Sequence, residues 1–158
     1  MDKLKLAIGC DEAAYALKVT IKKHLKENHP EIAVADFGAD AGDVVLYPDI
    51  AYTVADAVAA GECERAILVC GTGIGMSICA NKVPGIRAAV CHDPFSAERS
   101  RKSNDAQILC MGERVVGAEL AKYIVDIWLS SNFTGGGSTA KVERINELEQ
   151  VHIASFHE

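Results

Sequence analysis

The segment A-I-L-V-C-G-T-G-I-G-M-S-I-C-A-N-K, residues 66–82, carries the strongest structural signal in this chain. Apolar residues run up to Cys70, glycines follow at positions 71, 73 and 75, and a helix-permissive run comes next. This pattern is typical of a buried parallel strand that ends in a glycine-rich turn and opens a helix. Such a turn lets backbone approach a ligand, and its free N–H groups favour negative charge. We expect either an anion site beside the thiol or a turn that serves tight packing alone.

Strand-like and helix-like segments alternate on both sides of this turn. The expected strands are residues 3–10, 32–37, 66–70, 86–91 and 106–111, and the expected helices are 12–28, 49–60, the run after the glycine turn, 96–103, 118–129 and 141–153. This alternation predicts an α/β protein with a doubly wound (Rossmann- or flavodoxin-like), five-stranded parallel sheet. We expect the strand order 2-1-3-4-5, in which the first and third strands are neighbours. Asp11 and Cys70 would then lie together at the ligand-binding edge.

A glycine-rich stretch, residues 134–138, divides the expected α/β domain, residues 1–133, from a C-terminal segment, residues 134–158. The expected helix in this segment has apolar residues at positions 142, 145, 148 and 151. Such a stripe packs either on its own domain or on another subunit. We expect a homodimer or homotetramer in which this helix lies at the subunit interface and the active sites lie near it.

Composition excludes several classes of function. The chain has 158 residues, 49% of them apolar, and a formal net charge of −6 without a basic run, which argues against a nucleic-acid partner. No apolar stretch approaches the roughly 18 residues of a membrane helix, and Met1–Lys5 leads into a strand without a signal peptide. We therefore expect a cytoplasmic protein with no membrane partner. Its six cysteines are interpreted as reduced, mostly buried thiols rather than disulfides.

Two nucleotide-binding motifs are absent. Met76 stands where a dinucleotide fingerprint needs a third glycine, and no Gly-Lys-Ser/Thr follows the turn. The histidines at 24, 29, 92, 152 and 157 show no paired ligand spacing, so no metal site is expected. Tyr47 fits a ligand contact and a surface aromatic residue equally well.

Residues 69–91, V-C-G-T-G-I-G-M-S-I-C-A-N-K-V-P-G-I-R-A-A-V-C, closely resemble the ribose-5-phosphate isomerase B and galactose-6-phosphate isomerase family. The likeness extends to G-C-D at 9–11, Y-P at 47–48, S-N-D-A-Q at 103–107 and M-G-E-R-V-V-G-A-E-L-A-K at 111–122, and it fades after Phe133. The resemblance implies a cofactor-free, metal-free aldose–ketose isomerase that acts on a small sugar phosphate through a cis-enediolate.

The resemblance also implies roles for individual residues. Cys70 matches the group that moves the proton between C1 and C2, Asp11 matches a carboxylate that contacts substrate hydroxyls, and Thr72 matches a residue linked to ring opening. The positions that match the substrate pocket and oxyanion hole are Gly71, Gly73, Gly75, Ser77, Asn104, Tyr47 and Ser103. Arg114 matches an arginine that reaches the phosphate, and Lys141 replaces a second one. A base near the carbon and fixed donors near the oxygen are what this reaction needs.

The chain departs from the family pattern where the sugar ring is opened. Ser103 stands at the position of the usual ring-opening histidine, Glu12 replaces a histidine after Asp11, and Gly137 and Ser138 replace an arginine–histidine pair. Serine cannot shuttle a proton near neutral pH as imidazole does. The residues around Ser103 also resemble the erythrulose-phosphate isomerase branch of the family. D-erythrulose 4-phosphate is therefore the expected substrate, because its phosphate blocks the only hydroxyl that could close a ring.

Other interpretations remain open at this stage. Ribose 5-phosphate, or another pentose or hexose phosphate, is the alternative substrate, with His92, Thr72 or solvent opening the ring. A non-enzymatic alternative is a sugar-phosphate-binding module or an inactive subunit of a hetero-oligomer. The presence of Cys70, Asp11 and Asn104 together argues against an inactive subunit.

Overall fold

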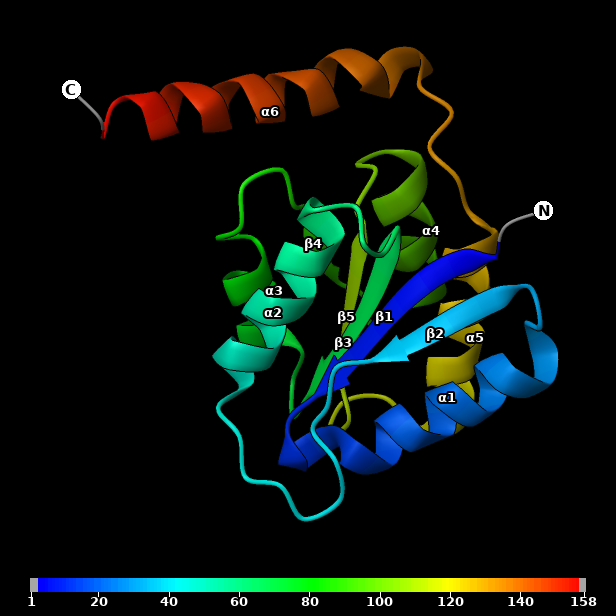
Figure 1. The fold of residues 1–158 in the computed structure, drawn as a ribbon. Helices are drawn as coiled ribbons and strands as arrows, with labels where there is room; N and C mark the ends of the chain where they lie inside the picture. The colour runs from blue at the N-terminus through cyan, green and yellow to red at the C-terminus, as the bar shows by residue number, and fades with distance from the viewer. Residues whose placement is uncertain (1–2, 157–158) are drawn as a thin grey trace.

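A five-stranded parallel sheet forms the centre of the computed structural model, which describes residues 3–156 (Figure 1). The strands are β1 (Leu4–Cys10), β2 (Ile32–Asp36), β3 (Arg65–Cys70), β4 (Ala88–Val90) and β5 (Ile108–Gly112). The helices are α1 (Tyr15–Asn28), α2 (Tyr47–Ala59), α3 (Ile74–Ala80), α4 (Pro94–Lys102), α5 (Ala118–Ser130) and α6 (Thr139–Ala154), with short 3-10 helices at Glu12–Ala14 and Gly136–Ser138. The predicted fold class is confirmed. Met1, Asp2, His157 and Glu158, which entered the expectations about the chain ends and the histidines, lie outside the described residues.

The order of the last two strands differs from the prediction. The sheet runs β2-β1-β3-β5-β4, so that β5 rather than β4 pairs with β3. Burial explains the difference: all residues of β5 are buried, whereas the three residues of β4 are only partly buried. A run that is apolar throughout fits an internal strand, and a short strand fits an edge. The predicted neighbourhood of β1 and β3 is confirmed.

Each face of the sheet carries its own apolar core. On one face, α1, α4 and α5 cover Leu6, Ile8 and Met111, and the fully buried Trp128 belongs to this layer. On the other face, α2 and α3 pack on Leu68 and its neighbours. Because α1 and α3 leave the adjacent strands β1 and β3 toward opposite faces, the chain opens a crevice where those two strands end.

Strand register determines which residues meet at this crevice. Cys10 pairs with Val69, so Asp11 follows β1 at the level of Cys70. Cys70 in turn pairs with Gly112 at the end of β5. The residues that follow three adjacent strands therefore come together at the carboxyl edge of the sheet.

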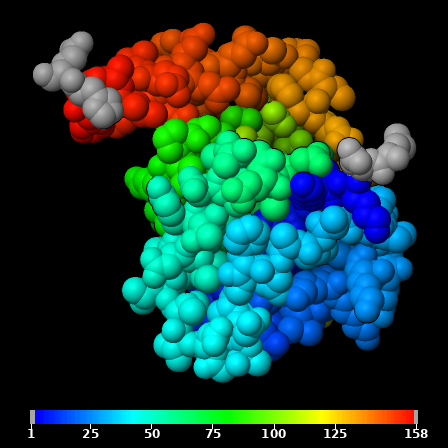
Figure 2. Space-filling view, in the orientation of Figure 1, coloured from blue at the N-terminus to red at the C-terminus, as the bar shows by residue number. Residues whose placement is uncertain are grey.

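The C-terminal helix α6 crosses the opposite, amino edge of the sheet and projects beyond it (Figures 1 and 2). Val142 is buried, the Arg87 guanidinium donates to Asn146 Oδ1 at 3.0 Å, and the Gly85 N–H donates to Glu149 Oε2 at 2.8 Å. Beyond these contacts the apolar side chains of α6 stay largely exposed, namely Ile145, Leu148 and Val151. Among the described residues, no helix is long and apolar enough to cross a membrane.

Candidate active site

A hollow of about 540 Å³ lies at the carboxyl edge of the sheet, where β1, β3 and β5 end. It is lined by Asp11, Glu12, Ala13, Tyr47, Cys70, Gly71, Thr72, Ile74, Gly75, Ile78 and Arg114. Seven of the predicted site residues are therefore brought together around one space. They come from four separate stretches of the chain, and the sheet register accounts for their meeting.

Cys70 and the glycine turn form the floor of this hollow. The backbone N–H of Gly73 donates to Cys70 Sγ at 3.1 Å, so the turn places a hydrogen-bond donor against the sulfur. Gly73 has a φ of 75°, and a Cβ there would lie 2.8 Å from the Met111 backbone. Both constraints require glycine at this position. The turn can therefore adopt this shape only with the predicted glycine.

The other thiols differ from Cys70 in their surroundings. All six cysteines are free, and burial raises the pKa of Cys10 to about 11, although Lys18 and the Ala39 carbonyl act in the opposite direction. Burial also raises the pKa values of the Cys91 and Cys110 thiols. These groups are protonated core residues near neutral pH. Cys70 is the thiol that faces the hollow.

Asp11 is held beside Cys70 by its own backbone. It precedes the 3-10 helix Glu12–Ala14, and its Oδ1 accepts the N–H of Ala13 at 3.1 Å. Partial burial and the neighbouring Glu12 carboxylate raise the pKa of Asp11, while backbone hydrogen bonds oppose that rise. Asp11 thus presents an acceptor of fixed orientation to the hollow.

Tyr47 and Arg114 bound the hollow on two sides. A Cβ on Gly75 would lie 2.5 Å from the Tyr47 ring, which shows that this ring rests directly on the first turn of α3. Tyr47 is therefore a wall of the hollow and not an isolated surface aromatic residue. The Arg114 side chain lies over Gly71 and its backbone N–H donates to the Gly71 carbonyl at 3.1 Å. No ion pair of Arg114 occurs within residues 3–156, so its guanidinium is available to an anion.

Four predicted site residues lie outside this hollow. Ser77 is buried on the inner side of α3, where its hydroxyl donates to the Ala88 carbonyl at 3.2 Å. Ser103 and Asn104 precede β5 and so lie at the amino edge, more than roughly 13 Å from Cys70 along the sheet at about 3.3 Å per residue. Lys141 is exposed in α6, which crosses the same amino edge. Within one chain, these residues do not join the Cys70 hollow.

Two hydrogen bonds at the site were not predicted from the sequence. His92 Nε2 accepts the N–H of Gly112 at 2.9 Å, which assigns the proton of the neutral ring to Nδ1. Burial lowers the pKa of His92, and the nearby Asp93 only partly offsets this effect. The backbone N–H of Val45 donates to Glu12 Oε2 at 3.3 Å and ties the loop before α2 to the hollow. Neither hydrogen bond can be predicted from the local sequence, because His92 and Gly112 are 20 positions apart and Glu12 and Val45 are 33 positions apart.

A larger side chain at Gly112 should disrupt the site. A Cβ there would lie 2.5 Å from Thr72 Cα and 2.8 Å from the Gly71 carbonyl oxygen, so Gly112→Ser must displace the turn that holds Cys70. We expect a loss of about 1–3 kcal/mol in the free energy of unfolding, which is the usual cost of overpacking. Urea denaturation followed by circular dichroism measures this loss.

The matched control is Gly117→Ser, five residues further along the chain. Gly117 is the N-cap of α5, with extended backbone and no atom within 4 Å of the position that a Cβ would take, and serine is favoured at an N-cap. We expect this variant to unfold at the same urea concentration as the parent or a higher one. Equal stability of the two serine variants would contradict the steric argument at Gly112.

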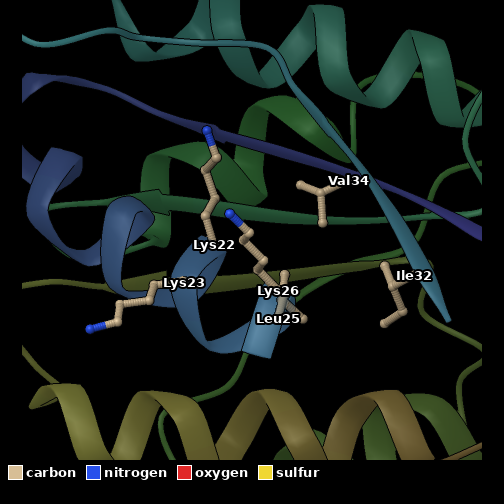
Figure 3. Close-up of a pocket in the computed structure, with 6 residues that line it drawn as sticks. All are labelled: Lys22, Lys23, Leu25, Lys26, Ile32 and Val34. Carbon is tan, nitrogen blue, oxygen red and sulfur yellow. The ribbon is translucent and has the colours of Figure 1, made fainter. Parts of the chain in front are cut away.

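A second hollow, of about 510 Å³, lies between α1 and β2 and is lined by Lys22, Lys23, Leu25, Lys26, Ile32 and Val34 (Figure 3). Lys22 and Lys26 extend on the side of β2, whereas Lys23 points away from them (Figure 3). Lys22 is engaged by the Asp36 carboxylate. This hollow contains apolar side chains and amines but no acid, thiol or imidazole among its lining residues, and it provides no acid–base pair for catalysis.

The carboxyl-edge hollow combines a thiol, a carboxylate, backbone donors and an arginine on a doubly wound sheet, which are features of an enzyme for small anionic substrates. The chain belongs to the Ribose/Galactose Isomerase family, whose model matches residues 6–145. This match continues past Phe133, where the resemblance was expected to fade. The predicted isomerase class is confirmed at the level of the family.

Individual relatives agree with this assignment. The chain is 53% identical to the D-erythrulose-4-phosphate isomerase of Pectobacterium atrosepticum over 147 residues, which are 92% of this chain and 95% of the relative. It is also 53% identical to the ribose-5-P isomerase B of Listeria innocua over 147 residues, 93% of this chain and 98% of the relative. Its structure matches that of Clostridium thermocellum ribose-5-phosphate isomerase B with a TM-score of 0.90 and 50% identity, covering 94% and 99% of the two chains.

Proposed function

We propose that this protein is a cofactor-independent isomerase that interconverts D-erythrulose 4-phosphate and D-erythrose 4-phosphate. The proposal rests above all on Cys70, whose sulfur faces the hollow, accepts the Gly73 N–H and shares the space with the Arg114 guanidinium, which has no ion pair among residues 3–156. One edge of the sheet thus carries three groups that the reaction needs. They are a base that can take a proton from carbon, N–H donors that can stabilise negative charge on oxygen, and a cation that can bind the phosphate. Family membership and the names of the relatives support the same reaction class.

The proposed reaction moves one proton between two carbons. Cys70, as the thiolate, removes a proton from C1 of the ketose, and the electron pair of that C–H bond forms the C1–C2 double bond of a cis-enediolate. The former carbonyl oxygen takes the negative charge, which backbone N–H groups of the 71–75 turn stabilise. The C1 hydroxyl proton moves to the C2 oxygen, and Cys70 returns its proton to C2, which leaves the aldehyde at C1. Asp11 orients the hydroxyls, and Arg114 holds the phosphate at the other end of the substrate.

The absence of an imidazole from the lining of the hollow supports a substrate that needs no ring opening. None of the described residues that line it in a single chain is histidine. Ser103, which stands at the ring-opening position of the family, accepts a hydrogen bond from the Arg99 guanidinium. The Nε2 of His92 is occupied by the Gly112 N–H. A tetrose 4-phosphate fits these conditions because it is always open-chain.

We also propose that a second copy of the chain completes the site. Asn104, Ser103 and Lys141 lie at the amino edge, away from their own Cys70, and the apolar side chains of α6 remain exposed there. A symmetric dimer would bring the amino edge of one copy to the carboxyl edge of the other. The C-terminal segment, residues 134–156 in the described part of the chain, would then belong to the interface.

Ribose 5-phosphate is the alternative substrate, since one of the two relatives at 53% identity is a ribose-5-P isomerase B. Identity to the Listeria ribose-5-P isomerase B equals identity to the Pectobacterium D-erythrulose-4-phosphate isomerase, so overall similarity does not discriminate between the two substrates. Thr72 lines the hollow and would be the remaining candidate for assisting ring opening, although its hydroxyl accepts the Ile74 N–H at 3.3 Å.

A side-by-side isomerase assay of the metal-free protein tests the choice. We expect kcat/KM for D-erythrulose 4-phosphate to exceed that for ribose 5-phosphate, L-erythrulose 1-phosphate and allose 6-phosphate at least tenfold, or about 1.4 kcal/mol of activation free energy. The variant Ser103→His serves as the control, and it should raise activity on ribose 5-phosphate relative to the tetrulose phosphate. Full activity on ribose 5-phosphate with none on D-erythrulose 4-phosphate would disprove the tetrose assignment.

A further inference from the structure

We propose that His24, His29 and Asp126 form a binding site for a divalent transition metal such as Zn²⁺, separate from the Cys70 hollow. The three residues converge on one point at the surface between α1 and α5. They lie near the end of α1 that faces the amino edge of the sheet, and none of the three lines the Cys70 hollow of its own chain. The sequence predicts no metal site, because the histidine spacing shows no paired ligands; the fold nevertheless brings His24 and His29 together, and a metal at this point is our proposal.

The ligand atoms of the three residues already lie close together. His24 Nε2 is 2.6 Å and His29 Nε2 is 2.8 Å from the same carboxylate oxygen, Oδ1 of Asp126. All three ligand atoms lie within 4.8 Å of one another. Two imidazole nitrogens and a carboxylate oxygen are a ligand set that suits Zn²⁺ and its transition-metal neighbours rather than Ca²⁺ or Mg²⁺.

The backbone explains how a five-residue spacing produces this pair. His24 lies within α1, and His29 is its C-cap, where the chain leaves the helix while the His29 N–H still donates to the Leu25 carbonyl at 2.8 Å. The departing chain turns the second ring toward the first, with ring centroids 5.7 Å apart and the planes at 64°. Asp126 is presented by α5, which packs beside α1 in the same core layer.

Each histidine also has a partner on its other ring nitrogen. Glu31 Oε1 lies 3.1 Å from His29 Nδ1, the carboxylate–histidine arrangement that orients metal-bound imidazoles. The Asn28 amide nitrogen lies 3.2 Å from His24 Nδ1 and donates to the His24 carbonyl at 3.0 Å, so Nδ1 of His24 is the acceptor in this pair. A metal ion would therefore displace the proton on His24 Nε2, whereas Glu31 can hold the ring proton of His29 on Nδ1 and leave its Nε2 free.

The space around the cluster suits an ion with three protein ligands. Tetrahedral Zn²⁺ with bonds of about 2.0–2.1 Å keeps its ligand atoms about 3.3 Å apart, so the two nitrogen–oxygen separations of 2.6 and 2.8 Å need to widen by less than about 1 Å. His24 borders a surface hollow of about 340 Å³, and His29 borders another of about 290 Å³. A water molecule can thus reach the fourth coordination position. Lys122, which lines the first hollow, is paired with Glu119.

Zinc binding would tie two helices together rather than change the isomerase reaction. We expect one Zn²⁺ per chain at pH 7.5, measured by isothermal titration calorimetry on the intact protein. Zinc at about 100-fold above its dissociation constant should raise Tm by at least about 5 °C, because the ion binds the folded chain only. The variants His24→Gln, His29→Gln and Asp126→Asn should each bind zinc at least tenfold more weakly, with circular dichroism confirming that they fold.

Two matched controls separate this site from other zinc ligands. His152→Gln removes an exposed histidine from α6, and Cys70→Ser removes the thiol of the hollow, and both should retain the one-to-one zinc binding. Unchanged affinity in both His24→Gln and His29→Gln would overturn the proposal. Loss of binding in Cys70→Ser alone would also overturn it, because zinc would then occupy the active site. If the parent chain binds no zinc at a zinc concentration on the order of 100 µM, the proposal is also overturned.

Discussion

Replacement of Cys70 by serine should abolish isomerase turnover while leaving the protein folded. The hydroxyl fits the same space but ionises too weakly to take a proton from carbon, so we expect kcat to fall at least about 10³-fold. Arg114 and the glycine turn remain in place, and binding of the sugar phosphate should therefore change only a few-fold. A coupled isomerase assay measures the first effect, and calorimetric titration of the variant with D-erythrulose 4-phosphate measures the second.

Cys79→Ser is the control for this substitution. Cys79 is a half-buried thiol of α3 whose Sγ lies 3.2 Å from the Pro48 carbonyl, outside the hollow, and its loss should leave turnover unchanged.

Mixing inactive Cys70→Ser chains with inactive Asn104→Ala chains should restore about a quarter of the activity if each site uses both copies of a dimer. Retention of a tenth or more of the activity by Cys70→Ser alone would contradict the assignment of Cys70 as the base.

Loss of the Asp36 carboxylate should cost more stability than any surface substitution. The Lys18 side chain is 1% exposed and its Nζ lies 2.9 Å from Asp36 Oδ1, and the Gly38 N–H donates to the same oxygen at 2.9 Å. Asp36→Asn leaves a buried charge without its counter-ion, which typically costs 3–5 kcal/mol. We expect a loss of about 3 kcal/mol in the free energy of unfolding, since the Ala39 carbonyl still accepts from Lys18. Urea denaturation at pH 7 measures this loss.

The dependence on pH gives this prediction a second, independent readout. Burial alone would raise the pKa of Asp36, but hydrogen bonds from Lys22, Gly38 and Lys18 outweigh it and hold the pKa below its ordinary value of 3.8. The stabilisation is therefore complete above about pH 4 and is lost as the pH falls through the lower folded-state pKa. The difference between the parent and Asp36→Asn should narrow below pH 4.

Two further variants complete the design for Asp36. Asp56→Asn, at an exposed position of α2, should change stability by less than about 0.5 kcal/mol. In the double variant Lys18→Met/Asp36→Asn the buried charge is gone, and part of the lost stability should return. A parallel offset between the parent and Asp36→Asn at every pH would show that the carboxylate charge is not responsible.

The sequence was sufficient to predict the sheet, its helical layers and the neighbourhood of Asp11 and Cys70, because periodicity and parallel topology determine all three. It did not determine the order of β4 and β5, since both runs are apolar and only their packing shows that β5 is internal. Ser77 was assigned to the substrate pocket through the resemblance, whereas its hydroxyl bonds to Ala88.

The pairing of His24 with His29 was missed for a different reason. A spacing of five residues does not place two side chains on one helix face, and their convergence depends on the exact residue at which α1 ends. Asp126 joins them from about a hundred positions away. Such contacts depend on how helices end and pack, and these details are the least accessible to pattern analysis.

Arg87 joins the turn before β5 to the C-terminal helix through the Asn104 and Asp105 carbonyls and the Asn146 side chain. The Cys70 turn is stabilised separately, by contacts confined to the other edge of the sheet. Mutations near Ser103 or in α6 can therefore accumulate without disturbing the thiol. The proposed dimer would thus separate two roles: substrate preference could drift along the amino edge of one copy while selection keeps the proposed proton-transfer residues constant at the carboxyl edge of the other.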